Sequence, residues 1–145
     1  MPATVASLQL CPGYRKPMVP VAEAPAVENL GFRGDMHAIA DSSRQVLLIE
    51  EETLNLLGLH PGEVKENITT RGIGLMNLKG RDRLRVGNEV TLEITKPCSP
   101  CSRMEELRPG LLKELAGRRG MLARVIRGGT IRNGDTIEHV VAPLL

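Results

Sequence analysis

The sequence predicts a mostly β protein, a closed or nearly closed β-barrel with a few short helices. Short stretches of strand-forming residues recur along the 145-residue chain, and glycine-rich turns separate them. Gly87-Asn88 and Asn133-Gly134 in particular are typical of β-hairpin turns. No fixed-period repeat and no linker-like segment interrupts this pattern, so we expect residues 1–145 to form a single domain.

The first part of the chain predicts two strands and one helix. Thr4–Leu10 alternates weakly and Gln45–Ile49 is a compact apolar run, so both are expected to be strands. Residues 11–32 contain four prolines, which rarely fit a regular element, and we expect a long ordered loop there. Glu50–Leu57 opens with three acidic residues and is followed by glycine, as is typical of a helix.

The second part predicts a hairpin, further strands and two helical pieces. Arg83–Val86 and Glu89–Thr95 flank the first hairpin turn, and alternate residues of the second arm share one face. The other expected elements are the strands Asn67–Thr70, Met121–Ile126 and Thr136–Val141, the helical pieces Met104–Leu107 and Leu111–Leu115, and a sharp turn at Gly128-Gly129.

The composition argues against several classes of protein. One Tyr, one Phe and no Trp leave little to stack on bases, and no nucleic-acid-binding motif is present, so nucleic acid is not an expected partner. Three cysteines without a leader-like or membrane-spanning segment favour a reducing compartment, and we expect a cytoplasmic protein. Residues 71–132 carry 14 basic and 6 acidic side chains, which predicts a positive surface for an anionic ligand such as a phosphate.

Cys101 is the main candidate for chemistry. It lies in the run Lys96-Pro-Cys-Ser-Pro-Cys-Ser-Arg103, on a loop that follows a predicted strand. Lys96 and Arg103 favour the thiolate, which is the form that attacks sulfur or ligates soft metals. An inert, half-buried cysteine also fits these local features, and they leave both interpretations open.

Cys98 and Cys101 together form a Cys-x-x-Cys motif. A structural zinc site needs four ligands, and only Cys11 and three scattered histidines remain to complete it. A thioredoxin-type pair would open a helix in an α/β context, whereas this context is rich in β-strands. A reversible disulfide between the two thiols stays open.

Three further clusters carry polar side chains. Asp35 and His37 are two residues apart, so they either brace a loop or present a proton donor to a ligand. The run from Glu66 to Gly72 offers amide, hydroxyl and guanidinium groups for an anionic small molecule, or caps a strand. The run from Arg127 to Asp135 offers backbone N–H groups and two arginines to phosphate oxygens, although such glycine-rich turns are common in barrels.

In their order along the chain, these segments resemble the MOSC family, the C-terminal domain of molybdenum cofactor sulfurase. The resemblance covers residues 4–141 and indicates a small stand-alone member. The segments that carry it are Gly-Phe-Arg-Gly-Asp-Met-His (31–37), Arg-Gln-Val (44–46), Glu-Asn-Ile-Thr-Thr-Arg-Gly (66–72), Arg-Leu-Arg-Val-Gly (83–87), Glu-Ile-Thr-Lys-Pro-Cys-Ser-Pro-Cys (93–101) and Arg-Gly-Gly-Thr-Ile-Arg-Asn-Gly-Asp (127–135).

The resemblance implies a MOSC-type β-barrel and a cysteine that ligates molybdenum or carries a persulfide. Some members of the family, including the amidoxime-reducing enzymes, reduce N-hydroxylated compounds with the molybdenum cofactor. Others are fused to a pyridoxal-phosphate desulfurase domain, of which nothing is present here. The family's Pro-Cys pair falls on Pro100-Cys101, whereas Cys98 stands where many members carry another, often basic, residue.

The expected function is that of a molybdenum-dependent oxidoreductase acting on a small molecule. Cys101 would ligate the metal of molybdopterin, Asp35 and His37 would orient or protonate substrate, and a separate protein would donate electrons. The residues expected to hold the pterin and phosphate are Asn67, Thr69, Arg71, Arg103, Arg127, Gly128 and Gly129. The alternatives are a non-catalytic carrier that receives sulfur or cofactor and passes it to a partner protein, and a plain binding module without molybdenum.

Overall fold

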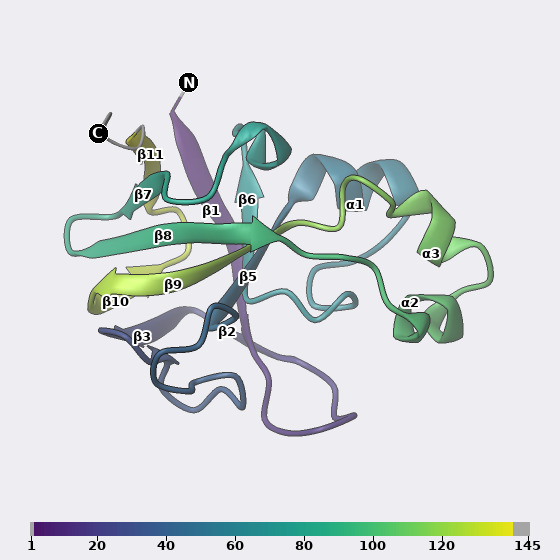
Figure 1. Ribbon diagram of the computed structural model, residues 1–145, viewed down its shortest axis with the longest axis horizontal. Helices are drawn as coiled ribbons and strands as arrows, with labels where there is room; N and C mark the ends of the chain where they lie inside the picture. Colours follow the sequence, from purple (N-terminus) through teal and green to yellow (C-terminus); the bar gives the residue numbers. More distant parts are fainter. Residues whose placement is uncertain (1, 141–145) are drawn as a thin grey trace.

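The computed structural model describes residues 2–140, and its centre is a closed barrel of seven strands (Figure 1). Around the barrel the order is β11 (Thr136–Val140), β7 (Arg83–Val86), β8 (Val90–Pro97), β9 (Met121–Arg127), β5 (Val46–Glu50), β6 (Ile68–Arg71) and β1 (Ala3–Leu10). Pairing of β11 with β1, Ala3 opposite Ile137, closes the barrel. Only β5 and β6 run parallel among these barrel pairings; the others are antiparallel. The predicted fold class is confirmed.

The expected long loop over residues 11–32 is wrong, because that segment contains three short strands. They are β2 (Val19–Val21), which pairs with β1, and β3 (Glu23–Val27) and β4 (Gly31–Phe32), which join β10 (Gly129–Arg132) in a second sheet. Pro25 lies within β3 opposite Thr130, and its carbonyl accepts a hydrogen bond from the Arg33 N–H at 2.9 Å. Pairing with residues a hundred positions away has overridden the local proline signal.

One of the two predicted hairpins is present. β7 and β8 pair across Gly87-Asn88, with Val86 opposite Val90. The turn at Asn133-Gly134 joins β10 to β11, but β10 pairs with β3 and β11 pairs with β7 and β1. This turn therefore links the two sheets and is not a hairpin. The expected last residue of β11, Val141, lies outside the described residues.

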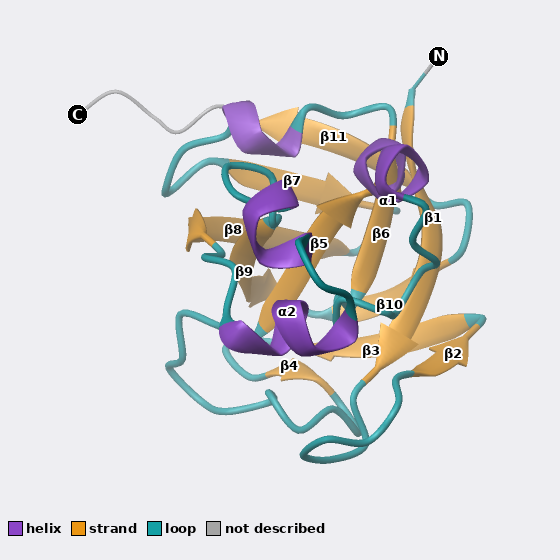
Figure 2. Cartoon of the chain, turned by 90° about the vertical axis from the view of Figure 1, so that its right-hand side faces the viewer, coloured by secondary structure: helices purple, strands orange, loops and turns teal. Residues whose placement is uncertain are grey.

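The predicted helices gather at one end of the barrel (Figures 1 and 2). They are α1 (Glu51–Leu57), α2 (Ser102–Leu107) and α3 (Leu111–Glu114), and the 3₁₀ turn η1 (Leu75–Asn77) is an additional element. Buried aliphatic side chains pack the three helices onto β5 and the loop that follows α1: Ile49, Leu54, Leu57, Leu59, Val64, Met104, Leu111 and Leu115. Among residues 2–140, none of the helices has the length and apolar character needed to span a bilayer.

The inside of the barrel is packed with aliphatic side chains, among them the fully buried Leu48, Leu84 and Leu92. Phe32 of β4 belongs to the same core cluster and is also fully buried. A barrel of this size is filled by its own side chains, so a ligand has to bind at an end and not along the axis.

Gly120 allows a close approach between two barrel strands. It precedes β9 with φ of +113°, and a Cβ atom there would collide with the carbonyl oxygen of Leu48 in β5. The Gly120 carbonyl also accepts a hydrogen bond from the Cys98 N–H at 2.9 Å. This glycine therefore fixes the approach of the β8–α2 loop to the β9 strand.

Replacing Gly120 with alanine is expected to destabilise the protein strongly. Gly117→Ala is the matched control, because Gly117 also has a positive φ, of +79°, but a Cβ atom there meets nothing within 4 Å. The control should show only the cost of backbone strain, about 1 kcal/mol, and Gly120→Ala should cost about 2 kcal/mol more. Urea denaturation measures both, and equal losses would contradict the close approach.

Candidate functional site

A cavity of about 500 Å³ opens beside α2, and several segments far apart in sequence line it. They are the loop after β1, the segment before and into β5, the residues leading into β6, the β8–α2 loop with α2, and the connection from α3 to β9. Its volume lies in the range of small-molecule sites. Among the lining residues are Cys11, His37, Asn67, Cys98, Cys101 and Arg119. All three cysteines of the chain therefore meet at this cavity.

Cys101 is the exposed thiol of the three. It is the N-cap residue of α2, and its side chain makes no capping hydrogen bond. Cys98 is buried in a small apolar cluster with Leu47 and Leu122, and Cys11 is buried as well. A soluble reagent, a metal or a partner protein can thus reach Cys101 far more readily than the other two.

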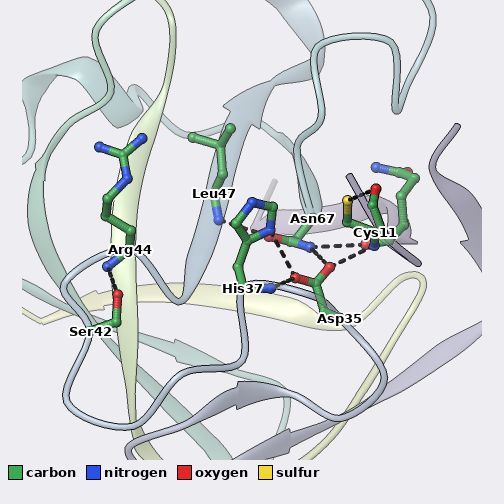
Figure 3. A network of polar contacts seen from close by, with 9 residues as sticks. Cys11, Asp35, His37, Ser42, Arg44, Leu47 and Asn67 are labelled. Atoms are coloured by element: carbon green, nitrogen blue, oxygen red, sulfur yellow. Dashed lines mark hydrogen bonds and ion pairs between the residues drawn. The ribbon is translucent and has the colours of Figure 1, made fainter. Parts of the chain in front are cut away.

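Asp35 joins the segments that form one wall of the cavity (Figure 3). Its carboxylate accepts hydrogen bonds from the backbone N–H of Cys11 at 2.6 Å, from the Asn67 amide at 2.8 Å and from the backbone N–H of His37 at 2.8 Å. Burial alone would raise the pKa of Asp35, but the hydrogen bonds from His37 and Cys11 outweigh burial and lower it. Asp35 is therefore a carboxylate that braces the wall.

The same carboxylate orients His37. The His37 Nδ1 atom lies 3.0 Å from Asp35 Oδ1, and because a carboxylate can only accept, Nδ1 carries the proton. The ring is partly exposed and lines the cavity. Its other nitrogen, Nε2, has no protein hydrogen bond within residues 2–140 and can act toward a ligand.

Asn67 lines the cavity, but its amide is already used within the protein. Its Oδ1 accepts from the Leu47 N–H at 3.0 Å, and its Nδ2 donates to the Gln9 carbonyl at 3.2 Å and to Asp35. These bonds connect β1, β5 and β6. The side chain thus holds the wall together, in addition to facing the cavity.

Several residues predicted from sequence lie away from the cavity. Thr69 is buried, and its hydroxyl donates a hydrogen bond to the Glu66 carboxylate. Arg71 is exposed and donates two hydrogen bonds to Glu51 of α1, at 2.8 and 3.0 Å. Arg127 is exposed at the end of β9. The structure does not bring these three side chains to Cys101.

Gly128 and Gly129 also lie outside the cavity, and close packing explains why both positions are glycine. A Cβ atom at Gly128 would meet the Ala26 carbonyl at 2.6 Å, and one at Gly129 would meet Glu89 Cβ at 2.5 Å. The pair carries the chain from the barrel into the second sheet. Of the residues expected to hold the pterin and phosphate, the cavity contains Asn67 and Arg103.

Arg119 is the main cavity residue that the sequence did not indicate. Its side chain is only 4% exposed, its Nη2 donates to the Val64 carbonyl at 2.6 Å, and Nε and Nη1 have no hydrogen-bond partner within residues 2–140. Burial lowers the pKa of Arg119, and the nearby Cys98, Cys101 and Glu66 oppose that effect. A buried guanidinium with unpartnered N–H groups is suited to an anion.

The rim of the cavity is cationic and partly aromatic. Tyr14, 72% exposed, has the guanidinium carbons of Arg15 and Arg103 at 5.5 and 5.8 Å from its ring centre. Arg15 donates a hydrogen bond to the Tyr14 hydroxyl, which lowers the pKa of Tyr14. Glu106 of α2 pairs with Arg15 at 3.4 Å and so links the loop after β1 to the helix.

Comparison with known proteins identifies the family and supports the fold. The family model of the MOSC domain matches residues 33–138. The chain belongs to the MOSC domain family. A curated relative from Gibberella moniliformis, named "Reductase", is 33% identical over 86 residues, which are 57% of this chain and 15% of that protein. This MOSC chain therefore spans only a small part of the length of that relative.

Solved structures share the fold of this MOSC protein. The YUAD protein from Bacillus subtilis matches with a TM-score of 0.85 at 21% identity, over 97% of each chain. YiiM from Geobacillus stearothermophilus matches with a TM-score of 0.77 at 18% identity, over 96% of this chain and 75% of that one. YiiM from Escherichia coli gives 0.73 at 19% identity, over 97% and 71%.

Replacing Asp35 with asparagine should destabilise this MOSC protein in a pH-dependent way. The variant places N–H groups against existing donors, so the loss near neutral pH should be about 2 kcal/mol or more. Because the folded pKa of Asp35 is lowered, its contribution is present above the unfolded pKa and is lost as pH falls through the folded pKa. The difference from the natural protein should therefore shrink below about pH 4.

Urea denaturation between acidic and neutral pH measures this difference. Asp41→Asn is the control, because Asp41 is exposed and its carboxylate accepts a hydrogen bond from Asn29 at 2.7 Å. That variant should stay within about 0.5 kcal/mol of the natural protein. A loss for Asp35→Asn that is independent of pH would show that the charge of Asp35 is not what stabilises the wall.

Alkylation should distinguish the three cysteines. Cys101 is exposed, whereas Cys11 and Cys98 are 4% and 7% exposed, so iodoacetamide should modify Cys101 several-fold faster near neutral pH. Mass spectrometry of digested protein gives the three rates. The fast reaction should vanish in Cys101→Ser, and equal rates for all three thiols would mean that Cys101 is not accessible in solution.

Proposed function

We propose that this MOSC protein binds the molybdenum cofactor in the cavity beside α2 and reduces N-hydroxylated or related small molecules there. In this proposal the Cys101 thiolate is the sulfur ligand of the metal. The observation that carries it is one cavity lined by both an exposed thiol, Cys101, and a buried guanidinium, Arg119, two of whose nitrogens have no hydrogen-bond partner within residues 2–140. MOSC domains are associated with binding of this cofactor, which supports the assignment.

The residues of the cavity fit the chemistry of the cofactor. Molybdopterin carries a phosphate, a polar heterocycle and a dithiolene that holds molybdenum, so it needs cations and one soft protein ligand. Five cationic side chains line the cavity against two acidic ones: Arg15, Arg44, Lys65, Arg103 and Arg119 against Glu63 and Glu106. In the proposal Arg119 binds the phosphate, and the cations of the rim bind the remaining polar edge.

The side chains that could donate to a metal are consistent with one protein ligand for molybdenum. Within residues 2–140, no group of three or more His, Cys, Asp or Glu side chains is arranged to hold a metal ion. Cys101 would therefore act together with the dithiolene sulfurs and not with other side chains. When bound, the molybdenum supplies two-electron redox chemistry at this position.

His37 and Asp35 would handle a proton. Reduction of an N-hydroxyl group to an amine consumes two electrons and two protons and releases water. A doubly protonated His37 ring would give one proton from Nε2 and become neutral, with its Nδ1 proton held by Asp35, and solvent at the open mouth would supply the second proton. A separate redox protein would supply the electrons. The name of the Gibberella relative supports a reductive reaction.

A carrier function is the second candidate, and the exposure of Cys101 favours it. A thiol on the surface can receive sulfur from a donor protein as a persulfide and pass it to an acceptor protein. This function needs the same thiol, but neither the cavity nor an electron donor.

Metal analysis tests the two functions directly. Protein purified from a host that makes the cofactor is expected to contain stoichiometric molybdenum and to reduce an amidoxime with a reduced viologen as electron donor. Cys101→Ser should lower that activity by at least about 100-fold. Arg71→Gln is the control and should leave activity and molybdenum content unchanged, because Arg71 is exposed outside the cavity.

Other outcomes would exclude the reductase. Sulfur that cyanide releases from Cys101, in protein without molybdenum, would support the carrier. Neither molybdenum nor releasable sulfur, with Cys101→Ser unchanged in each assay, would leave a binding module without molybdenum chemistry.

A further inference from the structure

A second hollow, here called the side pocket, adjoins the cavity beside α2 and shares part of its wall. It has a volume of about 360 Å³ and lies between the loop after β1, the residues that lead into β6 and the end of α2. Four of its residues also line the cavity: Arg15, Glu63, Lys65 and Leu107. Because the two hollows share these residues, one ligand can extend from the cavity into the side pocket.

The side pocket is largely apolar. Its remaining residues are Pro17, Met18, Pro61 and Gly62, and the shared Leu107 is 42% exposed. A Cβ atom at Gly62 would lie 3.4 Å from Met18 Cβ, so these two segments are close together. The Gly62 N–H donates to the buried Glu66 carboxylate at 2.9 Å, which anchors this turn. An apolar group of a ligand would therefore bind between walls that the protein holds in place.

The wall between the two hollows carries two cations and one acid. Glu63 is used locally, because its Oε1 accepts a hydrogen bond from the His60 N–H at 2.6 Å. Lys65 Nζ donates to the Lys16 carbonyl at 2.8 Å, and an ammonium has two further N–H groups to donate. The Arg15 side chain is 53% exposed. Both cations are thus available to an anionic group of a ligand in the side pocket.

Both cations have a backbone conformation that their residue types rarely adopt. The φ angle is +58° at Arg15 and +67° at Lys65, in the left-handed region that glycine, asparagine and aspartate adopt far more often. Glycine or asparagine would be the less strained choice at either position. Residues held in such conformations concentrate at active sites and ligand clamps. The strain is therefore support, independent of the pocket shape, for a binding role of these two side chains.

We propose that the side pocket binds an apolar, carboxylate-bearing part of the substrate, with Arg15 and Lys65 pairing with the carboxylate. The proposal rests on the proposed function and narrows its substrates to N-hydroxylated compounds with an acidic group on an apolar body. The N-hydroxyl group lies in the cavity with Cys101 and His37, and the apolar body contacts Leu107. The cavity cations that remain for the cofactor are Arg44, Arg103 and Arg119.

Two matched substrates test the proposal in the molybdenum-loaded protein. They are 4-(2-carboxyethyl)benzamidoxime and the corresponding neutral primary amide, assayed with reduced viologen. Two exposed ion pairs favour the carboxylate by about fivefold, so its KM should be about fivefold lower than that of the amide, with a similar kcat. The preference should weaken at high salt, because salt screens exposed charges. Equal KM values at low salt would overturn the proposal.

Asparagine variants separate each cation from its turn. Asparagine suits the left-handed conformation, so Arg15→Asn and Lys65→Asn should keep or raise the urea midpoint of unfolding. Each should lower the KM ratio of the two substrates about twofold, and the double variant should have a ratio near one. Arg81→Asn is the matched control and should leave the ratio unchanged, because Arg81 also has a positive φ, of +79°, but lines neither hollow.

Two results with the double variant would contradict the assignment. An undiminished KM ratio would show that the two cations do not bind the carboxylate. Loss of molybdenum would show that they hold the cofactor and not the substrate.

Protein without cofactor distinguishes failure of the side pocket from failure of the proposed function. NMR titration of ¹⁵N-labelled protein with 4-propylbenzoate and with 4-propylbenzamide gives both affinities and the amide signals that shift. The benzoate should bind about fivefold more tightly and shift the signals of Met18, Gly62 and Leu107. Equal affinities, or shifts confined to other residues, would overturn the side pocket. Absence of molybdenum or of reduction, with the benzoate preference intact, would reject the proposed function and leave the side pocket as an acid-binding site.

Discussion

The cavity of this MOSC protein depends on one buried carboxylate. Asp35 accepts hydrogen bonds from the end of β1, from its own turn and, through Asn67, from the residues leading into β6. Asn67 also links to β5, because its Oδ1 accepts a hydrogen bond from the Leu47 N–H. Hydrogen bonds to a charged group contribute about 1.5–3 kcal/mol each, so this network attaches the turn of Asp35 and His37 to β1 and to the residues before β6, which already pair in the barrel. The orientation of His37 follows from the same carboxylate.

The barrel also determines where charge gathers. Because aliphatic side chains fill its interior, polar chemistry is confined to the loops at its ends. The α3–β9 connection approaches β5 closely at Gly120. The preceding residue, Arg119, therefore lines the cavity together with Cys98 and Cys101. Cations elsewhere are used differently. Arg71, for example, bonds to Glu51 and secures α1 against β6.

Local signals predicted most of the fold and part of the site. The β7–β8 hairpin and α1 were predictable, because Gly87-Asn88 and the acidic helix start act within a few residues. The strands β2, β3, β4 and β10 were not, because they exist through pairing with distant segments, as when Pro25 lies opposite Thr130. The cavity contains Cys101, His37, Asn67 and Arg103, as the motif order suggested, but motif order does not say which end of a barrel a residue reaches. Arg127, Gly128 and Gly129 lie elsewhere for that reason, and Arg119, one of many arginines in a basic segment, had no distinguishing signal beyond the flanking Gly117 and Gly120.

The position of β11 between β7 and β1 has a consequence for biosynthesis. β1 can pair with β6 as soon as β6 has been synthesised. Its pairing with β11 is short, with Ala3 opposite Ile137 and Thr4 opposite Thr136. On the ribosome the cylinder cannot close until this strand has emerged, and meanwhile the edges of β1 and β7 stay open to pairing with other chains. Closure of the barrel therefore waits for β11, and a nascent chain stalled before β11 is an aggregation-prone species.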